Sequence, residues 1–164
     1  MNSKKRAIIF LCVLLVTVWL TGSGDTRALA CSCFPQPMDA ALKYSDAVFV
    51  GTVTNVEYLD DPKQTNPEPR IIVTFAVGRS WKGVTSREVV VHTIYNLWTC
   101  HGYYFHKDKE YLVFAYRNGP DDAKRFEPHK MPEVSLGVGL CGRTKLLSVA
   151  KDDLAVLGEG TVPK

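Results

Sequence analysis

The cysteines are the residues of this chain whose spacing most directly indicates chemistry. The chain contains five of them: Cys12, Cys31, Cys33, Cys100 and Cys141. Four thiolates could hold a tetrahedral zinc ion, but a C-x-C pair with two isolated, distant partners is an unusual zinc spacing. Cys12 lies in an apolar N-terminal run, and an even number of cysteines outside that run is typical of disulfide bonds in an exported protein.

The positions of the four remaining cysteines restrict their pairing without fixing it. Cys31 and Cys33 are too close in sequence to bridge each other without strain, so each is expected to pair with either Cys100 or Cys141. Distant partners also make a C-x-C redox pair an unfavoured alternative. Either pairing closes loops of about 70 to 110 residues, for which the chain-entropy model gives roughly 4 to 5 kcal/mol each. Both would hold still a terminus that would otherwise fray.

The first thirty residues have the order of segments found in a secretory signal peptide. Basic residues at positions 4–6 precede an almost unbroken apolar run over residues 7–20, and Ala28-Leu29-Ala30 fits a signal-peptidase site. The run is about 14 residues long, short of the roughly 20 needed to span a bilayer. We therefore expect residues 1–30 to be removed, and residues 31–164 to form one secreted, extracellular domain without a transmembrane span.

Two alternatives to this processing stay open. Residues 1–30 could remain as an uncleaved anchor, or Cys31 could be acylated to give a lipid-anchored protein at the cell envelope. The charged residues Asp25 and Arg27 are unusual so close to an acylation site. The distinction matters because a lipidated Cys31 has neither a free thiol nor a free amine.

Cleavage before Cys31 would create an α-amine next to the carbonyl oxygen of the same residue. These two atoms can form a five-membered chelate, and zinc accepts nitrogen and oxygen ligands at about 2.0 to 2.2 Å. An α-amine has a pKa of about 7.7 to 8.0 and loses its proton far more readily than a lysine. Disulfides that order the terminus in advance would lower the entropy cost of presenting this chelate to a metal ion in another protein.

Other candidate contact residues are small or aromatic. Ser32 is too short to clash with pocket walls, whereas Phe34 and Trp98 could serve as interface anchors or pack at the end of a barrel. The four histidines show no H-E-x-x-H spacing, and His101 and His106 lack a third ligand. No G-x-S-x-G, phosphate-binding loop or Ser/His/Asp grouping is present, so the sequence favours a binding protein without an intrinsic cofactor over an enzyme.

The charge balance argues against a nucleic-acid partner. The chain has 20 basic and 17 acidic residues, of which residues 1–30 hold four and one. The 16 of each sign that remain in residues 31–164 leave a formally neutral domain. Such a domain lacks the basic surface that displaces phosphate counterions.

The apolar patterning predicts a mainly β domain with two short helices. Strands are expected over residues 47–57, 71–77, 87–95, 110–116 and 134–141. Gly51 is expected at a bend or a bulge, and Gly137 and Gly139 are expected to allow curvature. A loop is expected over residues 60–69, and a turn at Asn118-Gly119-Pro120. Helices are expected over residues 38–44 and from a Ser148 cap to Leu157. Five strands with glycines inside them indicate a five-stranded OB-like barrel with short flanking helices.

Four segments of the chain match a known pattern. They are Cys31-Ser32-Cys33-Phe34-Pro35, Ser45-Asp46-Ala47-Val48-Phe49-Val50-Gly51, Tyr111-Leu112-Val113-Phe114-Ala115 and Leu140-Cys141. Together they resemble the N-terminal, netrin-like domain of the tissue inhibitors of metalloproteinases, over roughly residues 31–157. The C-x-C at a mature terminus is the most specific of these matches.

The resemblance implies an OB-like barrel with bridges Cys31–Cys100 and Cys33–Cys141. It implies a secreted, monomeric metalloendopeptidase inhibitor in which the Cys31 amine and carbonyl chelate the catalytic zinc of the partner protease. Ser32 would enter the primary specificity pocket of that protease. The rest of the interface would comprise Cys33, Phe34, Pro35, Leu97, Trp98 and Thr99.

The chain also departs from the family's pattern. The third bridge of the family, whose first cysteine would fall near Lys43, is absent, and bulky Trp98 replaces the small residues expected in the second contact segment. Without the C-terminal subdomain of the animal proteins, the chain resembles the short single-domain relatives found in bacteria. The competing expectation is therefore a non-inhibitory netrin-like binding module, including a lipid-anchored envelope protein.

Overall fold

The computed structural model describes residues 33–34, 36–59, 69–96, 101–127, 131–132 and 135–164. The predicted signal peptide and nearly all of the predicted loop over residues 60–69 lie outside this part of the chain. The longest helices within it have seven residues, and none of its helices could cross a membrane.

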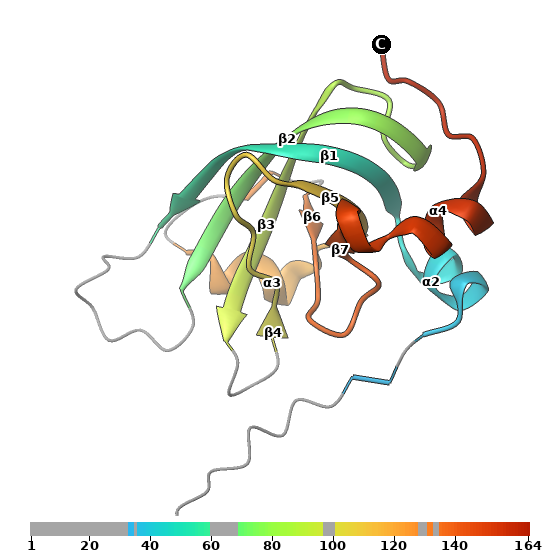
Figure 1. Cartoon of the computed structure of the whole chain (residues 1–164). Coiled ribbons are helices and arrows are strands. Elements are labelled where there is room, and N and C mark those ends of the chain that lie inside the picture. The colour runs from blue at the N-terminus through green and yellow to red at the C-terminus, as the bar shows by residue number, and fades with distance from the viewer. Residues whose placement is uncertain (1–32, 35, 60–68, 97–100, 128–130, 133–134) are drawn as a thin grey trace, which may run out of the picture. The chain divides into compact units, whose positions relative to one another are not determined.

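Five strands close into a barrel, as the sequence predicts (Figure 1). They are β1 (Ala47–Tyr58), β2 (Arg70–Lys82), β3 (Glu88–Asn96), β5 (Glu110–Arg117) and β6 (Leu136–Gly137). The order around the barrel is β1, β2, β3, β6 and β5, and β5 pairs with β1 to complete the ring. Only β3 and β6 run parallel among these pairs, with Val91 opposite Leu136. The domain is therefore mainly β, with an OB-like barrel.

The barrel interior is filled by alternate apolar side chains. In β2 the inward residues Ile71, Val73, Phe75 and Val77 are buried. Phe75 meets Phe49 and Phe105 edge to face, with ring centroids 5.5 and 5.1 Å apart, and Phe105 continues to Tyr111 at 4.9 Å. Edge-to-face pairs of this kind stabilise a core beyond their burial alone.

Short elements surround the barrel. They are α2 (Met38–Tyr44), β4 (His101–Gly102), α3 (Pro120–Arg125), β7 (Lys145–Leu146), the 3₁₀ turn η1 (Leu147–Val149) and α4 (Lys151–Leu157). Residues of α2 and α4 pack on a second apolar cluster outside the barrel, whose buried members are Ala41, Val48, Leu112, Phe114 and Ala150. The predicted helix over residues 38–44 is confirmed, as is the inward position of Ala150, Leu154 and Leu157.

The predicted bulge at Gly51 is present in β1. The register between β1 and β2 shifts between Val50 and Gly51. A Cβ atom at Gly51 would lie 3.1 Å from the Ala76 carbonyl oxygen and 3.2 Å from the Phe75 Cβ atom. Glycine thus lets the two strands approach closely where the barrel bends.

The predicted strand over residues 134–141 is wrong in extent, because among its described residues, 135–141, only Leu136 and Gly137 are paired as a strand. A Cβ atom at Gly137 would lie 2.2 Å from Asn118 Oδ1, so glycine permits the contact that closes the barrel. Beyond it the chain turns, and the Gly142 amide donates to the Gly139 carbonyl at 3.2 Å. Gly137 therefore permits the strand pairing, whereas Gly139 belongs to the turn that follows the strand.

Two local predictions also need correction. Asn118-Gly119-Pro120 does not form an isolated turn but leads into α3, where the Asp122 carboxylate accepts a hydrogen bond from the Gly119 amide at 2.8 Å. Ser148 does not cap the last helix, because it lies inside the 3₁₀ turn and Ala150 occupies the N-cap position. Proline at the first helical position and an acidic residue two positions later were the missed signals for α3.

The last residues of the chain bond β2 at Thr161 and the segment after β2 at Lys164. The Ser80 amide donates to the Thr161 carbonyl at 2.8 Å, and the Thr161 amide donates back to the Ser80 carbonyl at 2.7 Å. The Lys164 amide donates to the Thr85 carbonyl at 3.3 Å. The end of the described chain therefore continues the sheet beyond the point where β3 stops pairing with β2.

Candidate functional site

The predicted site lies only partly within the described residues. The members outside them are Cys31, Ser32, Pro35, Leu97, Trp98, Thr99 and Cys100. The members within them are Cys33, Phe34 and Cys141. The geometry of the site therefore rests on the segment of residues 33–37, without Pro35, and on the parts of the barrel that hold it.

A disulfide joins Cys33 to Cys141. The two Cα atoms are 4.9 Å apart and the residues are separated by 108 positions in sequence. Of the two pairings that the cysteine positions allow, this bond excludes Cys33–Cys100 and agrees with the one that the resemblance implies. The bridge Cys31–Cys100 stays a prediction.

The Cys141 side of this bridge is anchored firmly in the barrel. Three residues later, the Thr144 hydroxyl accepts from the Phe114 amide at 2.9 Å and donates to the Phe114 carbonyl at 3.2 Å. Directly after it, β7 pairs with β5. Because Phe114 belongs to a central strand of the barrel, the disulfide ties the N-terminal segment to a rigid element.

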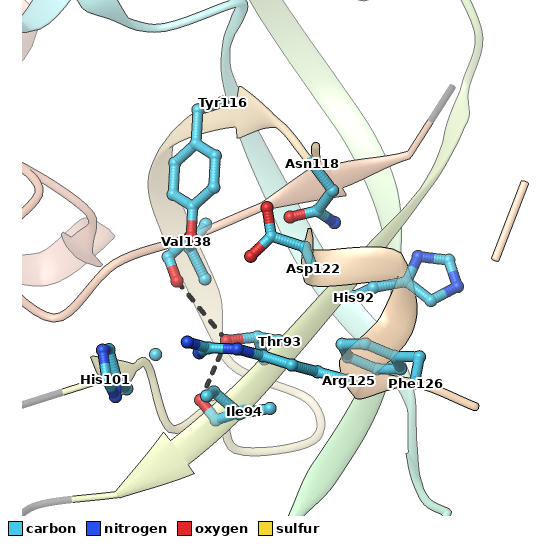
Figure 2. A pocket seen from close by; sticks show the side chains of 11 residues that line it. His92, Thr93, Ile94, His101, Tyr116, Asn118, Asp122, Arg125, Phe126 and Val138 are labelled. Atoms are coloured by element: carbon cyan, nitrogen blue, oxygen red, sulfur yellow. Dashed lines mark hydrogen bonds between the residues drawn. The ribbon is translucent and has the colours of Figure 1, made fainter. Parts of the chain in front are cut away.

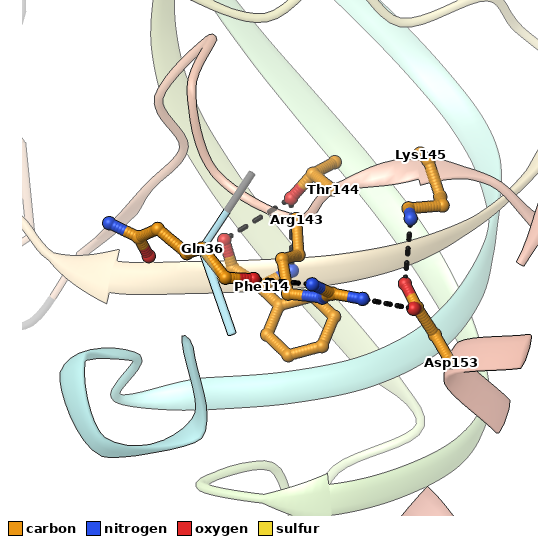
Figure 3. Close-up of polar contacts among 6 residues, drawn as sticks. All are labelled: Gln36, Phe114, Arg143, Thr144, Lys145 and Asp153. Carbon is orange, nitrogen blue, oxygen red and sulfur yellow. Dashed lines mark hydrogen bonds and ion pairs between the residues drawn. The ribbon is translucent and has the colours of Figure 1, made fainter. Parts of the chain in front are cut away.

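Arg143 gives the N-terminal segment a second attachment (Figure 3). Its Nη1 donates to the Gln36 carbonyl oxygen, and its Nη2 donates to Asp153 Oδ1. Lys145 approaches the other carboxylate oxygen of Asp153 at 2.8 Å. Burial raises the pKa of Asp153, but the hydrogen bonds and charges of Lys145 and Arg143 outweigh it, so the pKa lies below its ordinary value.

Helix α2 fixes the far end of the N-terminal segment. The Pro37 carbonyl accepts from the Ala41 amide at 3.0 Å, which begins the helix, and Ala41 is buried. Near the helix end, Lys82 Nζ donates to the Leu42 carbonyl at 2.8 Å. The described residues 33–34 and 36–37 therefore form a short link between a disulfide and an anchored helix.

Phe34 projects from this link into solvent. Its exposed fraction is 90%, which contradicts the alternative that it packs at the end of the barrel. Cys33, Gln36 and Pro37 are exposed as well. A large apolar side chain next to a disulfide, exposed on a well-anchored backbone, has the properties of an interface anchor.

The second predicted contact segment connects β3 with β4. Its ends are paired, since Asn96 lies opposite His101 and Tyr95 opposite Gly102. Gly102 has a φ of +69°, and a Cβ atom there would lie 1.3 Å from the Ile94 carbonyl oxygen, so only glycine fits this hairpin. The described residues on either side of positions 97–100 are therefore paired with each other.

Exposed aromatic residues adjoin the ends of β1 and β3, and sequence reasoning missed them. The Tyr104 ring contacts the Tyr95 ring at a tilt and the His106 ring edge to face, with ring centroids 5.2 and 4.8 Å apart. Burial and a hydrogen bond with Tyr104 raise the pKa of Tyr58 to about 12. Tyr58 and Tyr104 are exposed by 46% and 39%, so they add apolar surface close to the hairpin.

A polar cavity of about 200 Å³ lies between β3, β4 and α3 (Figure 2). Its lining side chains include His92, His101, Tyr116, Asp122 and Arg125. Burial and the charge of Asp122 raise the pKa of Tyr116, while Arg125 opposes them. Within the described residues no group of three or more His, Cys, Asp or Glu side chains could hold a metal ion. None of the described members of the predicted site lines this cavity.

Comparison with known proteins gives no family assignment. No protein-family model matches the chain, and no curated protein sequence matches it.

Sequence reasoning missed the Arg143 contacts with Gln36 and Asp153. One signal was available, because Asp153 lies three residues after Ala150 on the inner face of a short amphipathic helix. An acidic residue on such a face needs a buried cationic partner. The sequence pattern does not indicate whether Arg143 or Lys145 also binds Gln36.

Proposed function

We propose that the mature chain is a secreted inhibitor of a zinc metalloendopeptidase. In this proposal the α-amine and carbonyl oxygen of Cys31 displace the water at the open coordination position of the partner's zinc. Ser32 enters the primary specificity pocket, and Phe34 contacts the protease beside it. The zinc belongs to the protease, so the inhibitor needs no metal of its own.

The disulfide between Cys33 and Cys141 is the observation that carries this proposal. Cys31 is two residues from Cys33, so the two Cα atoms are separated by no more than about 7 Å. The bridge reaches a segment bonded to the central strand β5, and it leaves Phe34 exposed. Such an anchored terminus would lose little freedom on binding, which favours affinity.

The test compares two forms of the mature chain against a panel of purified zinc metalloendopeptidases. One form begins at Cys31 and the other carries a single alanine before it. We expect the first form to inhibit at least one protease, and the alanine to weaken inhibition by about two orders of magnitude, or roughly 2.7 kcal/mol. Adding the same alanine after Lys164 is the matched control and should change nothing.

Several outcomes would contradict the proposal. Equal inhibition by both forms would exclude chelation by the terminal amine. No inhibition across the panel, with a free Cys31 amine confirmed by N-terminal sequencing, would favour a non-inhibitory binding module. An intact mass raised by acyl chains would instead support a lipid-anchored envelope protein.

A further inference from the structure

Arg143 contacts two parts of the chain that are far apart in sequence. Its guanidinium binds the Gln36 carbonyl oxygen with one nitrogen and the Asp153 carboxylate with another (Figure 3). Asp153 is only 4% exposed, and Lys145 lies 2.8 Å from its second oxygen. Arg143 and Lys145 together compensate this buried carboxylate, and removing either partner would weaken that compensation, which favours keeping the guanidinium in place.

The Arg143 side chain is held in its orientation as well as paired with an opposite charge. Arg143 directly precedes Thr144, whose hydroxyl bonds both backbone groups of Phe114. At the other end of the side chain, Asp153 belongs to α4. A planar guanidinium that is bonded to Asp153 through one nitrogen presents its other nitrogen in a restricted direction. That second nitrogen binds the Gln36 carbonyl oxygen.

We propose that Arg143 and Asp153 are positioning residues for the N-terminal segment. The disulfide at Cys33 and helix α2 hold this segment at its two ends, and the exposed residues between them could still move. The bond from Arg143 to Gln36 supplies an attachment between those ends, which sets the direction in which the chain continues toward Cys31. The consequence for inhibition rests on the proposed function, whereas the positioning itself does not.

Lys145 provides a matched control within the same cluster. Arg143→Gln and Lys145→Gln each remove one positive charge from Asp153, but only Arg143 binds Gln36. A role limited to neutralising Asp153 predicts equal effects of the two substitutions. A positioning role predicts an effect of Arg143→Gln alone on the N-terminal segment.

The experiment measures backbone ¹⁵N order parameters in the exported protein. For Phe34 and Gln36 we expect order parameters of about 0.85 in the wild type and below about 0.6 in Arg143→Gln. In Lys145→Gln the two order parameters should equal those of the wild type. Asp153→Asn should lower the same two values, because Arg143 then lacks its inner anchor. Asp121→Asn, which removes the exposed pair with Lys124 on α3, should leave all values unchanged.

The order parameters of amides in the barrel distinguish a variant that has unfolded from one in which only the N-terminal segment has lost its position. Val48 and Val113 should keep their order parameters in every variant, with the Cys33–Cys141 bond intact. If Arg143→Gln does not fold, Arg143→Lys is the second variant. It keeps the positive charge but lacks the two-nitrogen guanidinium that binds Asp153 and Gln36 together, so it should still release Gln36. Unchanged order at Phe34 and Gln36, or equal effects of Arg143→Gln and Lys145→Gln, would overturn the inference.

Inhibition then tests the consequence separately. Against a protease that the wild type inhibits, Arg143→Gln should raise the inhibition constant about tenfold through faster dissociation, and Lys145→Gln should not. Loss of order with unchanged inhibition would overturn the functional consequence. If the wild type inhibits no protease, the proposed function fails, and the order parameters still decide whether Arg143 positions the segment.

Discussion

The barrel interior and the N-terminal segment are held in opposite ways. In the interior, Phe75 is fully buried and touches two further aromatic rings, and its neighbours along β2 are buried apolar residues. In residues 33–37 the described side chains are exposed, and the backbone is held by one disulfide and one guanidinium. Many distributed contacts maintain the first region, whereas a few discrete bonds maintain the second.

The residues that stabilise the fold are therefore largely different from the residues proposed to bind the protease. Losing one apolar contact in the barrel weakens the whole domain, because the core is a continuous packed cluster. Losing the bond at Gln36 frees a few exposed residues and leaves that cluster untouched. Substitutions in the two regions should therefore have different signatures in unfolding and binding experiments.

The largest effect is expected in the barrel interior. Phe75→Ala should lower the free energy of unfolding by about 3 to 5 kcal/mol, because it removes the ring between Phe49 and Phe105 and leaves a cavity. Urea titration measures this change. Val90→Ala, on the exposed side of β3, is the control and should cost far less. Similar costs for both variants would refute the distinction between the two regions.

Removing the disulfide should have the next largest effect. Cys33→Ser combined with Cys141→Ser should lower the free energy of unfolding by about 2 to 4 kcal/mol, since the bond closes a loop of 108 residues in the unfolded chain. The barrel itself should persist, with an unchanged near-ultraviolet circular dichroism spectrum. Loss of that spectrum would mean that the bond also organises the core.

Acid should weaken the ion cluster around Asp153. Its folded-state pKa is held below the ordinary value of 3.8, so the unfolded chain takes up the proton first as the pH falls. The stabilisation is therefore complete well above pH 3.8, begins to fall near that value, and is lost as the pH falls through the folded-state pKa. The difference in unfolding free energy between the wild type and Asp153→Asn should be constant from pH 7 to about pH 5 and shrink below about pH 4. A difference that grows on acidification would reverse the assigned sign.

The smallest effect on stability is expected at Phe34. Phe34→Ala should change the free energy of unfolding by no more than about 0.5 kcal/mol, because its side chain is 90% exposed. The matched substitution Phe105→Ala, at a buried ring, should cost several times more. Thermal unfolding of the two variants compares them directly, and a large loss with Phe34→Ala would show that this residue packs on the barrel in solution.

The elements that could be predicted from sequence are those that carry their own pattern. Strand β2 alternates inward Ile71, Val73 and Phe75 with more exposed residues, and α2 has an apolar face beside a proline start. Strand β6 has no such pattern, since two residues become a strand only by lying between β3 and β5. Its length is set by tertiary contacts that local periodicity does not encode.

The site shows the same division. The cysteine positions alone restrict the partner of Cys33 to Cys100 or Cys141, because only cysteines can form the bond. The structure shows that the partner is Cys141. The bond from Arg143 goes to a backbone carbonyl 107 positions away, and every residue has a carbonyl. No side-chain pattern identifies such an acceptor, so this attachment could be found only in the folded chain.

The pairing of Thr161 with Ser80 also bears on how the protein behaves at high concentration. Next to Ser80, where β3 no longer pairs with β2, the strand would otherwise offer unpaired amides and carbonyls. Open strand edges of this kind recruit other chains into intermolecular sheets. Thr161 thus covers an open position at this edge, and we expect that removing residues 161–164 would lower solubility at high concentration before it unfolds the domain.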